Sequence, residues 1–273
     1  MEENVNWSYW RKVNDRLILS YTIAPLSDLL HELEIQLPAF KLHYFIKRDQ
    51  EKYFKEKKNN LRDDELILQI DFAENYRLIN QNEVQEAHFS YQQVTIFTCV
   101  AWLRGQTECI AAISDKLTHN KFDVYCFLTK IVHKIQSQFE GISTVFIFSD
   151  GSTSQFKNKY ILTSIPSFVS EFGLKHLEWN FFATSHGKGA VDGVGAVVKR
   201  KVWQAVKTNN IILPDAFAFY ECAGKIIEGV RLLYISSKEI EEFSTPLNEK
   251  WEIVRSIPGN KKCIAFPTKI TKI

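Results

Sequence analysis

A short apolar segment that ends in a carboxylate constrains this sequence more than any other feature. It reads STVFIFSDG, Ser143–Gly151, with Asp150 directly after the apolar residues. An uninterrupted apolar strand is typical of a sheet that is covered on both faces. In open α/β sheets, the ligand crevice lies outside the carboxyl ends of the strands. Asp150 is therefore predicted to lie where chemistry takes place.

Two other acidic residues accompany apolar segments in a similar way. Asp71 closes the apolar part of LILQIDFAENY, Leu66–Tyr76, and Asp192 lies in SHGKGAVDG, just after another apolar segment. Carboxylate oxygens are ligands that Mg²⁺ prefers. We therefore predict a metal site made of Asp71, Asp150 and Asp192, with Glu74-Asn75 as a second source of ligands. The simpler interpretation is that the three acids occupy turns or the first turn of a helix.

The predicted elements follow one another in an order typical of an α/β fold. Three strands, expected to form an antiparallel meander, precede alternating helices and strands, which implies parallel neighbours joined by crossover helices. The segments are strands Leu66–Phe72, Gln93–Leu103 and Glu108–Ser114, a helix at 121–139, strand Thr144–Ser149, a helix at 154–172, a strand at 174–183 and a helix at 189–207. Met1–Leu37 is predicted to be helical, and Ile226–Ile235 to form another strand.

This order divides the chain into three expected parts. They are a helical N-terminal segment at 1–62, a main catalytic domain at 63–210 and a small C-terminal extension at 211–273. The 273 residues are 45% hydrophobic, enough for a packed core, and the net charge of +2 gives no overall basic excess. Any nucleic-acid surface must therefore be local. Five scattered cysteines, no visible signal peptide and no apolar run of about 20 residues predict a soluble, intracellular chain.

Taken together, the elements and acids resemble a known superfamily. Three strands, a helix, a strand, a helix, a strand and a helix is the order of the ribonuclease-H-like fold. The acids at 71, 150 and 192 are similar in placement to the acidic triad of retroviral integrases and cut-and-paste transposases, where the third acid is usually Glu. More narrowly, IDFAENY, FSDGSTSQFKNK and SHGKGAVDG look like segments of proteins encoded by transposable elements.

The resemblance implies a mixed five-stranded sheet with flanking helices and a specific chemistry. The implied activity is DNA strand cleavage and strand transfer, as in DNA integration and recombination, with Mg²⁺ or Mn²⁺ held by the three carboxylates. Two divalent ions roughly 4 Å apart activate the nucleophile and stabilise the leaving oxygen in such reactions. The resemblance also implies DNA as partner, a nuclear location and action as a homo-oligomer. No membrane partner is expected.

Basic and glycine-rich segments near the acids are candidates for contacts with DNA. The glycines beside His186 let a backbone approach phosphate, and His186 is predicted either to assist catalysis or to make a structural hydrogen bond. The candidates for phosphate contact are Lys157, Lys159, Lys188, Lys199, Arg200 and Lys201. A solvated surface is the alternative for these cations. Asp115 and His119 are reserve candidates for the site.

Two rival functions fit the same residues. One is a catalytically inactive, transposon-derived protein that binds nucleic acid and keeps only the fold. The other is a ribonuclease H or exonuclease type of enzyme, which cuts RNA–DNA hybrids or free ends without joining strands. Metal binding and the preferred substrate distinguish these possibilities.

Overall fold

The chain forms two compact units in a computed structural model. The structure describes residues 3–79, 92–183, 189–255 and 265–267. The first unit is Met1–Asp49 and the second is Gln50–Ile273.

The first unit is a β-hairpin followed by the start of a long helix. Strands β1 (Asn4–Val13) and β2 (Arg16–Pro25) pair antiparallel along their whole length. The two residues between them, Asn14 and Asp15, have φ angles of 48° and 62°, as a two-residue hairpin turn with both residues left-handed requires. Helix α1 (Leu26–Asn59) follows directly and contains Pro38 in its interior.

The prediction of a helix over Met1–Leu37 is therefore wrong for its first 25 residues. The hairpin wins because aromatic and β-branched residues alternate on both sides of a two-residue turn, a pattern with period two rather than 3.6. The leucine-rich part from Leu26 onward is helical as predicted. Pro38, predicted to interrupt the helix, is accommodated within it.

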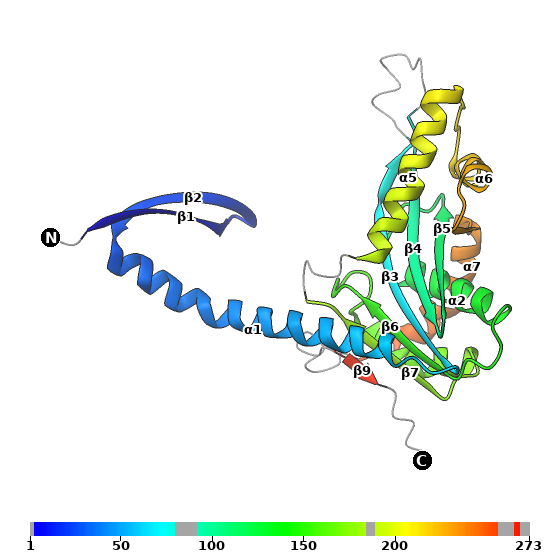
Figure 1. The fold of residues 1–273 in the computed structure, drawn as a ribbon, viewed down its shortest axis with the longest axis horizontal. Helices are drawn as coiled ribbons and strands as arrows, with labels where there is room; N and C mark the ends of the chain where they lie inside the picture. Colours follow the sequence, from blue (N-terminus) through cyan, green and yellow to red (C-terminus); the bar gives the residue numbers. More distant parts are fainter. Residues whose placement is uncertain (1–2, 80–91, 184–188, 256–264, 268–273) are drawn as a thin grey trace. The chain divides into compact units, whose positions relative to one another are not determined.

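The second unit contains a seven-stranded mixed sheet (Figure 1). Its strands are β3 (Glu65–Arg77), β4 (Gln93–Leu103), β5 (Gln106–Ser114), β6 (Thr144–Ser149), β7 (His176–Phe181), β8 (Arg231–Tyr234) and β9 (Ala265–Pro267). The strand order is β8-β5-β4-β3-β6-β7-β9. Strands β3, β4 and β5 form the antiparallel meander, β6 and β7 run parallel to β3, and β8 runs parallel to β5.

The five central strands confirm the predicted ribonuclease-H-like fold. They are arranged as β5-β4-β3-β6-β7, with only β4 antiparallel to the other four, and helices connect the later strands. The sheet is larger than the predicted five strands, because β8 joins one edge and β9 the other. Strand β8 comes from the predicted C-terminal extension, so this part of the chain completes the same sheet.

The helices of the second unit are shorter or more numerous than predicted. They are α2 (Lys121–Gln136), α3 (Lys159–Thr163), α4 (Ile165–Glu171), α5 (Ala190–Asn209), α6 (Ala216–Ile226) and α7 (Ser237–Glu252). The single helix predicted at 154–172 is two short helices that meet at Ser164, where Pro166 lies in the first turn of α4. Helix α6 was not predicted.

Helices cover both faces of the sheet. One core packs β3, β4 and β6 against α2, α3, α4 and α7, and a second packs β3, β4 and β5 against α5 and α6. A third cluster joins the end of α1, through Tyr53 and Phe54, to Phe148 of β6. All six residues of β6 are buried, as its uninterrupted apolar sequence predicts.

Candidate active site

Adjacent parallel strands bring Asp71 and Asp150 together. Gln69 of β3 pairs with Phe148 of β6, so Asp71 and Asp150 lie two residues further along on the same face. Strand β3 does not end at Asp71 as predicted, because it continues to Arg77 beside β4. Asp71 instead lies at the level where its other neighbour, β6, ends.

Helix α5 brings Asp192 to the same edge of the sheet. Its buried valines recur at helical spacing, and Gly195 lets its first turns approach β3 and β4 closely. A Cβ at Gly195 would lie only 3.1 Å from the Cβ of Ala73. This approach encloses a pocket of about 280 Å³, whose polar lining residues are Asp71, Glu74, Thr98, Asp192 and Lys199.

The carboxyls in this region repel one another. Burial is the largest effect on Asp71 and, together with the charges of Asp150 and Asp192, raises its pKa to about 7. The backbone N–H of Phe72, 2.8 Å from Asp71 Oδ1, opposes this rise. Burial also raises the pKa of Asp150, against a hydrogen bond from the Ser152 backbone N–H at 2.9 Å. A bound cation would relieve this repulsion.

Asp192 takes part less directly. Its side chain is exposed, and its Oδ2 accepts a hydrogen bond from the backbone N–H of Gly189 at 2.7 Å, which caps α5. Among the residues that the structure describes, no three His, Cys, Asp or Glu side chains are grouped closely enough to hold one metal ion. Two buried carboxylates with hard oxygen donors fit Mg²⁺ or Mn²⁺, and Asp192 lies within electrostatic range of Asp71.

A bulge in β3 adds Glu74 to the pocket. Ala73 pairs with Ile96 and Tyr76 with Val94, so Glu74 and Asn75 together oppose a single residue of β4. Glu74 lines the same pocket as Asp71. Burial lowers the pKa of Lys199 in this pocket, and the charge of Glu74 opposes the shift.

Asn75, the other bulge residue, connects to His119. His119 Nε2 lies 2.8 Å from Asn75 Oδ1 and 3.2 Å from Thr95 Oγ1, and its ring stacks on Phe72 at 4.2 Å between centroids. Burial lowers the pKa of His119, which favours the neutral ring. This reserve candidate therefore supports the strand that carries Asp71, on the opposite face of the sheet.

The second reserve candidate, Asp115, lies in a helix cap. Its carboxylate accepts hydrogen bonds from the backbone N–H and the hydroxyl of Ser237, at 2.7 and 2.8 Å, at the start of α7. These contacts give Asp115 a structural role.

The basic candidates are placed differently from one another. Lys199 lines the pocket, and Arg200 and Lys201 are exposed beside it on α5. Lys157 lies over the ring of Phe181, 5.3 Å from its centroid, at the end of β7. Lys159 instead donates a hydrogen bond to the carbonyl of Val254 at 2.8 Å, which ties α3 to the end of α7. His186 and Lys188 lie outside the described residues.

Comparison with known proteins gives a family whose function is not described. The family "Domain of unknown function (DUF8701)" matches residues 50–272. The chain belongs to this family. The matched region and the second compact unit begin at the same residue, Gln50, so the hairpin arm lies outside the DUF8701 domain. No curated protein matches the chain.

Solved structures give only remote likenesses to this DUF8701 protein. The human cytomegalovirus terminase nuclease domain, manganese-soaked and inhibitor-bound, is 12% identical with a TM-score of 0.29, covering 77% of this chain and 82% of that one. A second structure of that domain is also 12% identical, with a TM-score of 0.29 and coverages of 73% and 84%. NurA bound to dAMP and manganese is 10% identical with a TM-score of 0.20, covering 69% and 43%.

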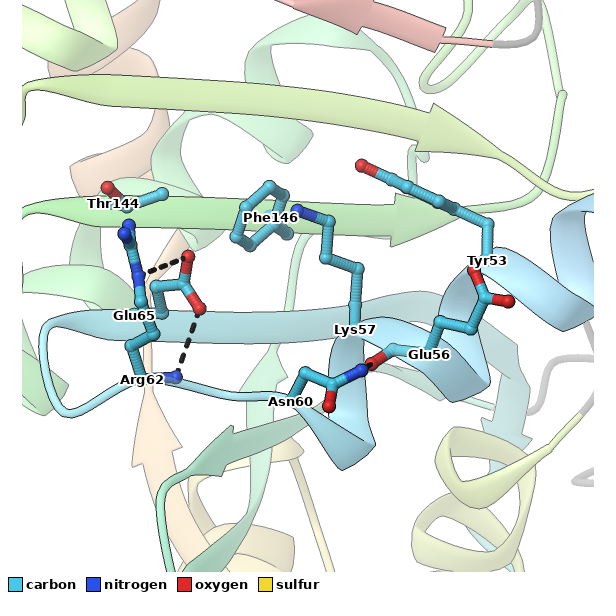
Figure 2. Close-up of a pocket in the computed structure, with 8 residues that line it drawn as sticks. All are labelled: Tyr53, Glu56, Lys57, Asn60, Arg62, Glu65, Thr144 and Phe146. Carbon is cyan, nitrogen blue, oxygen red and sulfur yellow. Dashed lines mark hydrogen bonds and ion pairs between the residues drawn. The ribbon is translucent and has the colours of Figure 1, made fainter.

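A second pocket of the DUF8701 domain lies at the opposite end of the strands (Figure 2). It has a volume of about 450 Å³ and is lined by the end of α1 and the first residues of β3 and β6. Arg62 Nε lies 3.0 Å from Glu65 Oε1, and Lys57 Nζ lies 3.9 Å from the centroid of the Phe146 ring. Because these charges contact groups of the chain itself, the pocket is best explained by the packing of α1 on the sheet.

None of the helices in the described part of the chain is both long and apolar enough to span a bilayer.

Proposed function

We propose that the DUF8701 domain is a transposase- or integrase-like enzyme that cleaves DNA strands and transfers them to a target. The observation that carries this proposal is the pair of partly buried carboxylates, Asp71 and Asp150, side by side on the central parallel strands of a ribonuclease-H-like sheet. A divalent ion held there activates a water or a 3′-hydroxyl and stabilises the leaving oxygen. Mg²⁺ and Mn²⁺ both suit such oxygen ligands.

Each residue of the site has a proposed role in this reaction. Asp71 and Asp150 hold the metal, and Asp192 completes the site from the start of α5. Lys199 in the pocket and the exposed Arg200 and Lys201 bind the phosphate backbone, and Lys157 does so from the end of β7. His186 and Lys188 keep their predicted roles as a catalytic and a phosphate-binding residue. The proposed place of action is the nucleus, with the chain working as a homo-oligomer.

One observation favours a second function, that of an inactive descendant which binds nucleic acid. Asp192 is exposed and engaged by its own helix cap, and no three potential ligands are grouped in the described residues. A chain that has lost its third ligand would keep the fold and the basic residues of α5. Its DNA binding would weaken steeply with salt but would not require a divalent ion.

A calorimetric titration and a cleavage assay test these functions together. Mg²⁺ and Mn²⁺ are titrated into the wild type, Asp150→Asn and the matched control Asp63→Asn, whose carboxylate lies on the surface beside Arg104. Labelled DNA duplex and RNA–DNA hybrid serve as substrates. We expect the wild type and Asp63→Asn to bind metal and cut duplex DNA, and Asp150→Asn to do neither.

The other outcomes of this experiment separate the rivals. Cutting of the hybrid alone, or cutting without joining, would assign a ribonuclease or exonuclease instead. A wild type that binds DNA in a salt-dependent manner, but binds no metal at millimolar concentration and cuts nothing, would identify an inactive descendant. Equal loss of metal binding in Asp150→Asn and Asp63→Asn would show that the metal binds elsewhere.

A further inference from the structure

The helical part of the first unit presents an apolar row to solvent. The row lies on α1 before the unit ends at Asp49 and consists of Leu26, Leu30, Leu33, Leu37, Phe40 and Tyr44. Each of these side chains is between 43% and 62% exposed. The spacing alternates between four and three residues throughout, which is the repeat that keeps one seam of a helix facing a partner helix.

The hairpin that precedes the helix also has an uncovered apolar face. The cross-strand register places Trp10 beside Leu19, and Tyr21 and Ile23 follow on the same face of β2. Trp10, Tyr21 and Ile23 are 66%, 76% and 73% exposed. A two-stranded hairpin is marginally stable in water by itself. The first unit thus exposes apolar surface on both of its elements.

We propose that this row is the interface between two copies of the chain, which associate along α1 as a short two-stranded coiled coil. A row of this type is self-complementary, because the side chains of each copy fill the gaps between those of the other. Leu26 and Leu33 fall at d positions and Leu30 and Leu37 at a positions of one heptad register. Pro38 falls at the outer b position, where its ring does not obstruct the seam.

The area available is what a stable dimer needs. Six side chains that are about half exposed offer on the order of 500 Å² per copy, and the hairpin face adds a similar area, so two copies bury about 2,000 Å². The helical seam spans about 27 Å, or two and a half heptads, which is short for a coiled coil. The apolar face of the hairpin is therefore part of the interface. This surface is separate from the carboxylate site, because all of its residues precede Gln50.

The mass of the full-length chain in solution tests the proposal. Sedimentation equilibrium and light scattering are performed on the wild type, on the seam variant Leu30→Glu/Leu37→Glu and on the control variant Ile35→Glu/Leu42→Glu. Ile35 and Leu42 are 63% and 61% exposed and lie on α1 outside the seam. We expect the wild type and the control to have twice the 31.7 kDa mass of one chain, and the seam variant to be monomeric.

Two further measurements separate association from folding. Circular dichroism must show the same helix content in all three chains, so that loss of the dimer is not loss of α1. Cross-linking with a short bis-maleimide should then give more dimer for Leu33→Cys than for Ile35→Cys, each measured above the wild-type background. A monomeric wild type at micromolar concentration overturns the proposal, and would mean that the chain itself covers the row. A dimer that survives in the seam variant, or is lost equally in the control, overturns it too.

Discussion

Replacing Asp71 by Asn tests the electrostatics of the carboxylate pair without assuming any activity. Burial, with the charges of Asp150 and Asp192, raises the pKa of Asp71 from 3.8 to about 7. The folded chain therefore holds this proton more tightly than the unfolded chain, so the free energy of unfolding falls as pH rises from about 4 to about 7. At about 1.4 kcal/mol per pH unit, the penalty above this range has a ceiling of about 4 kcal/mol. Screening by solvent in the pocket reduces the expected value to about 2 kcal/mol.

Asn has nearly the same shape as Asp and can still accept the hydrogen bond from Phe72 N–H. Asp71→Asn should thus be about 2 kcal/mol more stable than the wild type near pH 8, and only about one third of that near pH 5. Urea denaturation followed by tryptophan fluorescence, with EDTA present, measures both values. Asp192→Asn, whose carboxylate is exposed, should change stability little at either pH. An Asp71→Asn chain that gains nothing near pH 8, or gains equally at both pH values, would refute the reasoning.

Other predictions concern the elements that build the site. Gly195→Val should lower stability by about 1–3 kcal/mol, because the new side chain meets β3 where α5 crosses it, whereas Gly193→Ala, in open space, should raise it by up to about 1 kcal/mol; thermal unfolding compares the two. Ser149→Ala should cost about 1–3 kcal/mol in chemical denaturation, because the buried N–H of Trp179 loses its acceptor at 3.0 Å. Arg200→Ala should weaken DNA binding equally for all sequences and reduce the salt slope by about 1 in fluorescence anisotropy; an unchanged slope would place DNA away from α5.

The central sheet could be predicted because its signals are local. The sequence of β6 is apolar without interruption, since both faces of that strand are buried. The strand β4, predicted over Gln93–Leu103, has those bounds in the structure. The proximity of Asp71 and Asp150 follows from placing two such strands side by side in parallel, which the order of elements already implied. Asp192 was placed correctly in the first turn of a helix, but its exposure depends on the Gly189 cap.

The parts that were missed depend on other kinds of signal. The hairpin could have been found, since two alternating segments flank Asn14-Asp15, but leucines from Leu26 onward dominated the interpretation. The bulge at Glu74-Asn75 could not. It is held by Thr95, whose hydroxyl lies 3.1 Å from Asn75 Oδ1 and 2.6 Å from the carbonyl of Lys116, and neither partner is near it in sequence. Tertiary contacts of this kind leave no local pattern.

The bulge also makes the length of β3 intolerant of change. It shifts the alternation of the strand by one residue, so that Tyr76 faces Phe219 of α6, 5.1 Å between ring centroids, rather than the opposite core. Deleting one codon at Glu74 would restore regular pairing and turn Tyr76 and Leu78 away from the core that they now share with α5 and α6. Natural insertions and deletions in this family are therefore expected to avoid this strand, and engineered ones at this point should give insoluble protein even when every residue of the pocket is kept.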